Sequence, residues 1–198
     1  MAAQHATRSR PAGPPARQVR PRGGGVGRSS GPAAEAVSDA LRRGSSGDLT
    51  RRRGVAGLAL TAIGSFLAVA AYQHGLVRHL PDPPGRWFDS DAVDASGEAY
   101  AAGRMPDAAL GIASYAVTLA LAGMGDAERA REHPMWPLAM AGKVGLDAVG
   151  AVFLTLEQVT KHKRICTYCT AASAATLAMV PLVVPEARRA WVTWRARR

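Results

Sequence analysis

Cys166 and Cys169 are the only cysteines of this 198-residue chain, and two residues separate them. A pair with this spacing can close a small disulfide ring, which suits repeated oxidation and reduction better than bracing a fold. Lys161, Lys163 and Arg164 come just before the pair, and a long apolar segment begins with it. A helix N-terminus and neighbouring cations both favour the thiolate, the form that attacks a disulfide or a quinone. We therefore predict a redox-active thiol pair.

Metal binding is the alternative use of these cysteines. His162, Cys166 and Cys169 offer three ligands close together in the sequence. A structural zinc site takes four ligands, and the chain has no second cysteine pair to complete one. We therefore predict no metal site.

Four apolar segments are able to hold the pair at a membrane surface. At 1.5 Å per residue, each approaches the thickness of the hydrocarbon core of a bilayer. The last of them starts at the cysteine pair and ends at Pro185. The predicted fold is all-α, an integral membrane bundle of four transmembrane helices, with spans at residues 55–72, 108–124, 137–160 and 167–185.

The third segment is the least uniform of the four because it carries Lys143, Asp147 and Glu157. Lys143 and Asp147 are four residues apart, so they share one helix face and can pair. Asp147 lies near the middle of the predicted span, where an ionisable group usually faces protein or a cavity. Two interpretations remain open at this point, a mutually neutralising pair between helices and a proton path or ligand contact.

The first 54 residues differ from the rest in composition. They carry eleven Arg, no Lys, three acidic residues and five Pro, with few large apolar side chains. Such a segment buries too little apolar surface to offset the entropy lost on ordering. We predict a disordered basic tail over residues 1–54, a membrane domain over 55–185 and a second basic tail over 186–198. No nucleic-acid-binding motif accompanies the charge, so no nucleic-acid partner is expected.

The charges at the two ends predict an orientation. Arginine next to a membrane helix holds that end in the cytoplasm, so both tails are predicted to be cytoplasmic in a multi-pass protein of the cell membrane. The loop 73–107, with six acidic residues and three Arg, then lies on the extracytoplasmic face together with the cysteine pair. The basic cluster at residues 161–164 opposes this orientation, but the terminal clusters are larger.

The order of these features resembles the vitamin K epoxide reductase family, the membrane thiol oxidoreductases that bacteria use to regenerate disulfides. Three stretches carry the resemblance, residues 94–100, 105–115 and 165–170, and it covers about residues 55–185. The resemblance implies a four-helix membrane fold in which the cysteine pair passes electrons between thiols and a membrane quinone held between the helices. It does not distinguish menaquinone from ubiquinone.

The resemblance also assigns roles to single residues. Cys169 corresponds to the cysteine that faces the quinone, and Cys166 to the one that exchanges with incoming thiols. Asp107, at the mouth of the second span, corresponds to a residue that hydrogen-bonds a quinone oxygen. Tyr115 matches an aromatic eight residues later, and Ser173 matches a hydroxyl donor one turn beyond the pair.

One departure from the family pattern affects the expected function. The family has a second cysteine pair in the extracytoplasmic loop, whereas this sequence has Asp94, or a neighbour, and Ser96 at the corresponding places. Neither residue forms a disulfide. The resemblance then implies that an extracytoplasmic thioredoxin-fold carrier or a substrate thiol reaches Cys166 directly. The alternative is a non-catalytic membrane scaffold or partner-binding subunit on the same fold.

Overall fold

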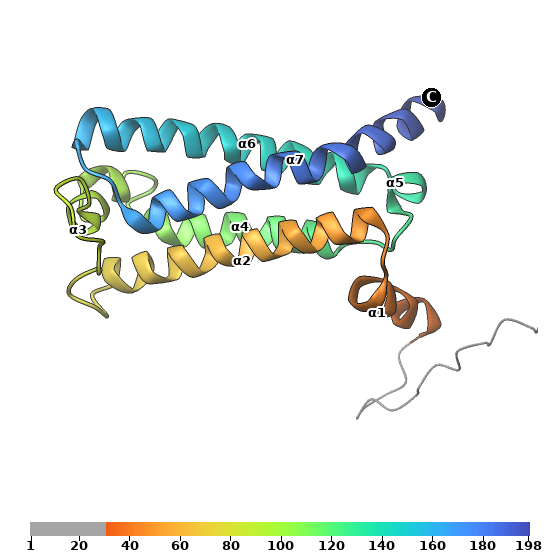
Figure 1. Cartoon of the computed structure of the whole chain (residues 1–198), viewed down its shortest axis with the longest axis horizontal. Helices are drawn as coiled ribbons and strands as arrows, with labels where there is room; N and C mark the ends of the chain where they lie inside the picture. Colours follow the sequence, from red (N-terminus) through yellow and green to blue (C-terminus); the bar gives the residue numbers. More distant parts are fainter. Residues whose placement is uncertain (1–30) are drawn as a thin grey trace, which may run out of the picture. The chain divides into compact units, whose positions relative to one another are not determined.

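The structure is a computed structural model that describes residues 31–198, and the part of the predicted tail before them lies outside the described residues. Pro32–Arg198 form one unit, and its described elements are helical apart from a single parallel bridge between Phe88 and Ile165 (Figure 1). The elements in chain order are α1 (Pro32–Arg43), α2 (Gly47–Gln73), α3 (Ser90–Asp94), the 3-10 helix η1 (Gly97–Tyr100), α4 (Asp107–Gly123), α5 (Arg129–Glu132), α6 (Met135–Glu157), the π-helical turn η2 (Gln158–His162) and α7 (Thr167–Ala196).

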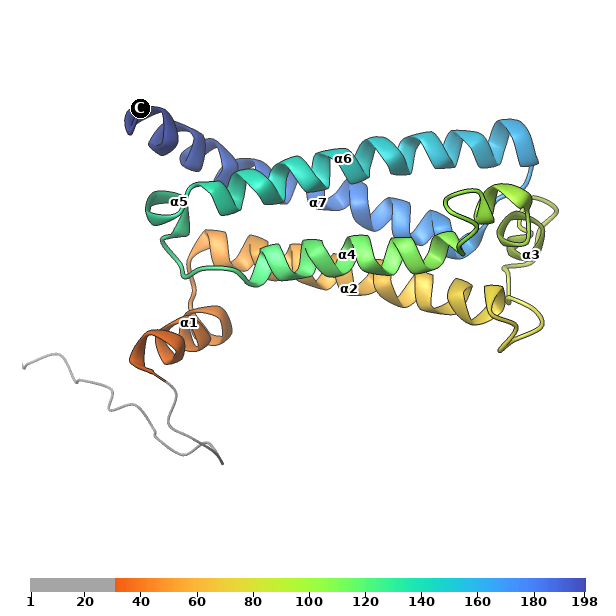
Figure 2. The same ribbon diagram turned by 180° about the vertical axis from the view of Figure 1, so that it is seen from behind.

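Four helices, α2, α4, α6 and α7, lie side by side and form the bundle (Figures 1 and 2). α2 packs on both α4 and α7, and α6 packs on α7, whereas α4 and α6 touch over a shorter stretch. Many residues of the core are small, which lets the helices approach closely. The buried core includes Val55, Ala59, Ala62, Ala122, Met140, Val144, Ala172 and Met179. α3 and η1 lie at the end of the bundle where α7 begins, and α1 and α5 lie at the other end (Figure 1).

The predicted all-helical class is confirmed for the described residues. Three helical segments are long and apolar enough to cross a membrane, namely Gly47–Gln73, Met135–His162 and Thr167–Ala196. The remaining bundle helix, Asp107–Gly123, has 17 residues and is shorter. The structure therefore supports the first, third and fourth predicted spans by length. It shows the second, predicted at residues 108–124, as a shorter apolar helix of the same bundle.

The prediction of disorder is wrong for residues 32–54, because they form α1 and the first part of α2. At the start of α2, the side chain of Arg52 is buried rather than solvated. Its guanidinium donates to four carbonyl oxygens at and after the end of α4, those of Ala122, Met124, Gly125 and Asp126, over 2.8 to 3.0 Å. These four hydrogen bonds hold the start of α2 against the end of α4.

The helix of the fourth predicted span, residues 167–185, is longer than the sequence indicates. α7 does not stop at Pro185 but continues to Ala196. A proline removes one backbone donor, but membrane helices tolerate it where neighbouring elements pack against the helix. Glu186 and Ala190, both beyond the proline, are buried. These contacts keep the chain helical through residues that the sequence assigned to a basic tail.

A buried ion pair joins α5 to α7 at this end of the bundle. Nε of Arg129 donates to Oε1 of Glu186 over 2.8 Å, and Nη2 donates to Oε2 over 2.9 Å. Nη1 donates to the carbonyl oxygens of Leu121 and Met124, and Nη2 also contacts the sulfur of Met140. All five N–H groups of Arg129 are therefore used, although the side chain is fully buried.

Replacing Glu186 by Gln leaves the Arg129 cation buried without its counter-charge. We expect this change to lower the free energy of unfolding by about 3–5 kcal/mol, measured by thermal unfolding in detergent with circular dichroism. The matched control is Asp39→Asn in α1, which removes the exposed ion pair with Arg43 and should cost less than about 1 kcal/mol. Equal effects of the two changes would contradict the role given to the buried pair.

Candidate active site

Cys166 and Cys169 lie at the first turn of α7, as the sequence predicts. Cys166 is the N-cap residue, and its sulfur accepts a hydrogen bond of 3.1 Å from the backbone N–H of Cys169. The side-chain oxygen of Gln158, in η2, accepts the N–H of Cys166 over 2.9 Å. Cys166 is completely buried and Cys169 is partly exposed, and both are free thiols.

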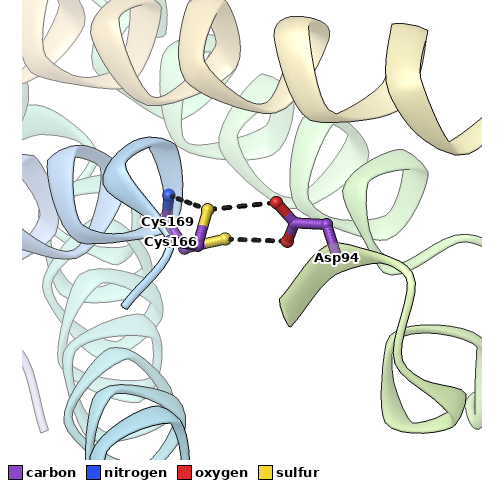
Figure 3. Close-up of side chains that lie close together, drawn as sticks. All are labelled: Asp94, Cys166 and Cys169. Carbon is purple, nitrogen blue, oxygen red and sulfur yellow. Dashed lines mark hydrogen bonds between the residues drawn. The ribbon is translucent and has the colours of Figure 1, made fainter. Parts of the chain in front are cut away.

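The carboxylate of Asp94, the last residue of α3, contacts both sulfurs (Figure 3). The thiol of Cys166 donates to Oδ2 over 3.1 Å, and the thiol of Cys169 lies 3.5 Å from Oδ1. Asp94 is one of the two residues that the family resemblance placed where a loop cysteine stands. The structure therefore brings this loop position onto the thiol pair, but with a carboxylate in place of a third sulfur.

The cations that precede the pair bind elsewhere. Nζ of Lys161 forms ion pairs with Glu98 and Glu157 at 2.6 and 3.2 Å. The guanidinium of Arg164 donates to the carbonyl oxygen of Arg86. The charged group that contacts the two sulfurs is therefore an anion, whereas the sequence had indicated cations.

Asp94 is 1% exposed, and this burial raises its pKa from 3.8 to about 6. The hydrogen bonds from the two thiols act in the opposite direction, and the negative charges of Asp107 and Asp82 add to the upward shift. Asp94 is thus mainly ionised at neutral pH, when it can accept a proton. It becomes a neutral acid under mildly acidic conditions.

Residues 80–100, here called the cap, are fixed over the start of α7 by Asp82. One carboxylate oxygen accepts the hydroxyls of Ser90 and Thr167 at 2.6 Å each, and the other accepts the N–H of Ser90 at 2.7 Å. Burial alone raises the pKa of Asp82, but these hydrogen bonds outweigh it and hold the pKa below its ordinary value. Asp82 therefore stays ionised and holds the cap closed.

The backbone adds two further bonds between the cap and the residue before Cys166. The N–H of Ile165 donates to the carbonyl oxygen of Trp87 over 2.9 Å, and the N–H of Asp89 donates to the carbonyl of Ile165 over 3.2 Å. These bonds make the parallel bridge between Phe88 and Ile165. Cys166 is covered for this reason, even though it directly follows a loop.

Gln73, at the end of α2, connects the cap to α4. Its Nε2 donates to Oδ1 of Asp107 over 2.7 Å and to the carbonyl oxygen of Asp94 over 3.2 Å, and its Oε1 accepts the N–H of Ala108. Sequence reasoning missed Gln73, Gln158 and Asp82. A single glutamine or aspartate carries no motif, so only their contacts in the fold identify them as positioning residues.

A cavity of about 690 Å³ lies beside the thiol pair, between α4 and α6 and beneath the cap. Most of its wall is apolar and includes Phe66, Leu110, Leu146, Val149, Phe153 and Leu154. The cavity brings together Cys169 and the three predicted quinone contacts, Asp107, Tyr115 and Ser173. Cys166 is not part of the wall. The two cysteines therefore face different surroundings, one the cavity and the other the cap.

The hydroxyl groups of Tyr115 and Ser173 differ in the hydrogen bonds that they already make within the protein. Thr176 donates its proton to the carbonyl oxygen of Ala172, so in the 2.5 Å contact between Tyr115 and Thr176 the donor is Tyr115. Tyr115 therefore contributes mainly its ring, which stacks on Phe66 at a centroid distance of 5.8 Å. Among residues 31–198, the hydrogen-bond partner of the Ser173 hydroxyl is Thr155, at a long distance of 3.4 Å.

Lys143 and Asp147 form the predicted ion pair, and two residues of α4 join it. Nζ of Lys143 donates to the hydroxyl of Ser114 over 2.8 Å, and that hydroxyl lies 3.3 Å from Oδ1 of Asp147. Thr118 completes the cluster at 3.5 Å from both charged groups. Asp147 and Ser114 also line the cavity. The pair thus bridges α4 and α6 and presents polar atoms to the cavity, which combines features of both interpretations.

The metal alternative also takes a different form in the structure. His162 lines the cavity but does not join the cysteines in a group of ligand atoms. Within residues 31–198, the group that could hold a metal ion consists of Asp94, Cys166 and Cys169, whose ligand atoms all lie within 4.8 Å of one another.

A family model described as the vitamin K epoxide reductase family matches residues 54–184. This match covers all of α4, α6 and the cap, α2 from residue 54 and α7 up to residue 184, and it includes both cysteines. No curated protein and no solved structure matches the chain.

The raised pKa of Asp94 predicts how stability depends on pH. Its ionised form disfavours the folded state, and this cost is fully present above about pH 6 and is lost as the pH falls through that value. The free energy of unfolding should rise by about 1 kcal/mol between about pH 7 and pH 5 in the wild type but not in Asp94→Asn. Glu98→Gln, which removes an exposed carboxyl group, should retain the wild-type dependence. Parallel pH profiles of wild type and Asp94→Asn would contradict the assignment.

The bonds of Asp82 predict how well Cys166 is protected. In a Cys169→Ser background, Asp82→Asn should speed alkylation of Cys166 at least about tenfold, because a hydrogen bond to a charged group stabilises by about 1.5–3 kcal/mol. Mass spectrometry of the alkylated protein measures the rate. Glu98→Gln in the same background is the control and should leave the rate unchanged. An unchanged rate in Asp82→Asn would show that this residue does not hold the cap closed.

Proposed function

Because the chain belongs to the vitamin K epoxide reductase family, we propose that it is a membrane oxidoreductase that passes electrons between thiols and a quinone through Cys166 and Cys169. One observation carries the proposal, namely that Cys169 opens onto a largely apolar cavity while its partner Cys166 faces the cap. A thiol pair between two such surroundings can react with a lipid-soluble molecule on one side and with a protein thiol on the other.

The residues around the cavity fit a quinone. The volume of about 690 Å³ lies within the usual range of small-molecule sites, roughly 300–1,000 Å³. Its walls are apolar, which suits a ring with an isoprenoid chain. The three predicted contacts all carry polar groups, but the carboxylate of Asp107 is held by Gln73 and the hydroxyl of Tyr115 by Thr176. When bound, a quinone would accept two electrons and two protons and so return the pair to the disulfide.

The thiol side of the reaction uses Cys166. A substrate thiolate attacks the Cys166 sulfur of the oxidised pair, forms a mixed disulfide and releases Cys169. The second substrate thiol then attacks the mixed disulfide and releases Cys166, so the substrate loses two electrons and the pair becomes a dithiol. Asp94 is placed to take the Cys166 proton at Oδ2 when the pair is oxidised again. Electron flow in the opposite direction would use the same atoms.

The thiol partner comes from outside the chain in this proposal. By the family resemblance, Asp94, or a neighbour, and Ser96 stand at the places of the family's two loop cysteines, and neither can relay electrons. Cys166 is also fully covered. A thioredoxin-fold carrier or a substrate thiol must therefore displace the cap to reach the sulfur. The cap is attached by hydrogen bonds of side chains and by two backbone bonds rather than by a disulfide, which makes such an opening feasible.

The charge distribution supports the predicted orientation. α1, α5 and the C-terminus lie at the same end of the bundle (Figure 2). These segments and the adjoining start of α2 are rich in arginine, with Arg42, Arg43, Arg51, Arg53, Arg131, Arg189, Arg195 and Arg197. The cap at the other end is acidic. By the positive-inside rule, the arginine-rich end lies in the cytoplasm and the cap lies outside it, with four helices crossing the cell membrane.

The first test follows the thiols of purified protein in detergent. After full reduction, a soluble quinone should remove both free thiols of the wild type rapidly, as counted by mass-tag alkylation, and Cys166→Ser and Cys169→Ser should each leave their remaining thiol free. Thiols that stay reduced in a folded wild type would contradict the redox function and favour the scaffold alternative.

A second test asks whether the cavity is the quinone site. Gly150 lines the cavity and has open space at its Cβ position, so Gly150→Leu fills part of it. We expect quinone-dependent oxidation of the thiols to slow, because the leucine side chain occupies space that a bound quinone needs, while reduction of the disulfide by dithiothreitol is unchanged. Gly142→Leu is the matched control, since Gly142 also lies in α6 with open space but does not line the cavity. Equal rates in both variants would place the quinone elsewhere.

A further inference from the structure

We propose that Asp94, Cys166 and Cys169 of the reduced protein bind one Zn²⁺ ion, and that the bound ion keeps the pair from being oxidised. The three residues come from two elements far apart in the sequence, α3 and the start of α7, and their side chains point toward a common centre (Figure 3). The inference rests on the reduced thiols and on Asp94, and it does not require the quinone reaction proposed above.

The spacing of the ligand atoms fits zinc. In a tetrahedral site with bonds of about 2.3 Å to sulfur and about 2.0 Å to oxygen, a sulfur and an oxygen ligand lie roughly 3.5 Å apart. Each sulfur lies at a similar distance from one of the two carboxylate oxygens of Asp94, 3.1 Å from Cys166 Sγ to Oδ2 and 3.5 Å from Cys169 Sγ to Oδ1. All three ligand atoms lie within 4.8 Å of one another. Small side-chain movements are therefore enough to form the site.

Two features of the start of α7 favour the thiolate form of the cysteine ligands. The sulfur of Cys166 accepts the backbone N–H of Cys169, and both sulfurs lie at the N-terminal end of the 30-residue helix α7. N–H donors and a helix N-terminus favour thiolates. Gln158 fixes the backbone of Cys166, and Gln73 fixes the backbone of Asp94, so outer contacts orient ligands from both elements.

The cavity supplies a way in and a fourth position. Asp94 and Cys169 both line it, so an ion entering there meets a carboxylate and a sulfur first. Cys166 closes the site from the buried side. Three protein ligands with one open position are the arrangement of a zinc site that also holds a water molecule.

Binding has a defined balance of atoms. One Zn²⁺ replaces the protons of two thiols, so two protons are released and no electrons are transferred. The oxidised pair has no thiolates to offer, and the zinc-bound pair has no free thiolate to attack a disulfide. Zinc binding and disulfide formation therefore exclude each other. The ion would hold the enzyme in its reduced state until a chelator or a stronger metal-binding partner removes it.

The test uses the reduced full-length protein in detergent with Co²⁺ as a spectroscopic probe and Zn²⁺ in competition with a chromophoric chelator. We expect one ion per chain, cobalt–thiolate charge-transfer absorption that Zn²⁺ abolishes, release of two protons, and protection of both thiols from alkylation. Asp94→Asn removes a direct ligand. It should weaken Zn²⁺ binding at least about tenfold, because loss of even an outer-shell residue weakens metal binding about tenfold or more. Asp94→Cys supplies a thiolate in the same place and should restore the site.

His162→Ala is the matched control, because His162 lines the same cavity but lies outside the ligand group. It should bind Zn²⁺ with wild-type affinity. The proposal is overturned if the wild type shows no cobalt–thiolate absorption, or if Asp94→Asn, shown to be folded by circular dichroism, binds Zn²⁺ as tightly as the wild type. Quinone-dependent oxidation is measured separately on chelator-treated protein, so failure of either proposal is distinguishable from failure of the other.

Discussion

The contact of one carboxylate with two thiols is the interaction on which the functional end of this protein depends. Asp94 lies on the cysteine pair only because the cap is fixed in place by Asp82, by Gln73 and by the backbone bonds of Ile165. A buried ionised carboxyl group needs such partners, since an unpaired charge without them is very costly. The same contact opposes the rise in the pKa of Asp94 that burial causes, and it completes a group of three possible metal ligands.

At the opposite end of the bundle, buried positive charges also have hydrogen-bonding partners. Arg52 and Arg129 are buried and use their guanidinium groups to satisfy carbonyl oxygens that α4 leaves exposed at its end. α4 is the shortest bundle helix, and the chain after it turns back through α5. In an apolar environment each free carbonyl costs several kcal/mol. The two arginines remove this cost, and the ion pair of Arg129 with Glu186 ties the turn to α7.

Between these two polar ends, α4 and α6 diverge enough to leave the cavity. The ion pair of Lys143 and Asp147, together with Ser114, bridges the two helices. A polar bridge at that depth is costly unless its members are paired and hydrogen-bonded, as they are here. It leaves room for an apolar ligand nearer the cap, next to Cys169, where the wall is mostly hydrocarbon. The arrangement places Cys169 at an apolar cavity and the buried sulfur of Cys166 under the cap.

The sequence by itself determined the features that depend on interactions within one segment. Apolar segments fixed the four bundle helices, and the spacing of Cys166 and Cys169 fixed a thiol pair at a helix start. The four-residue spacing of Lys143 and Asp147 placed them on one helix face, where they do pair. Only the tertiary structure decided which groups meet those residues. Lys161 adjoins the pair in sequence but bonds to Glu98, while Asp94, 72 residues before Cys166, touches both sulfurs. Likewise, α7 continues beyond Pro185 because Glu186 forms a buried ion pair with Arg129. Contacts between distant segments depend on how helices pack, and no single segment contains that information.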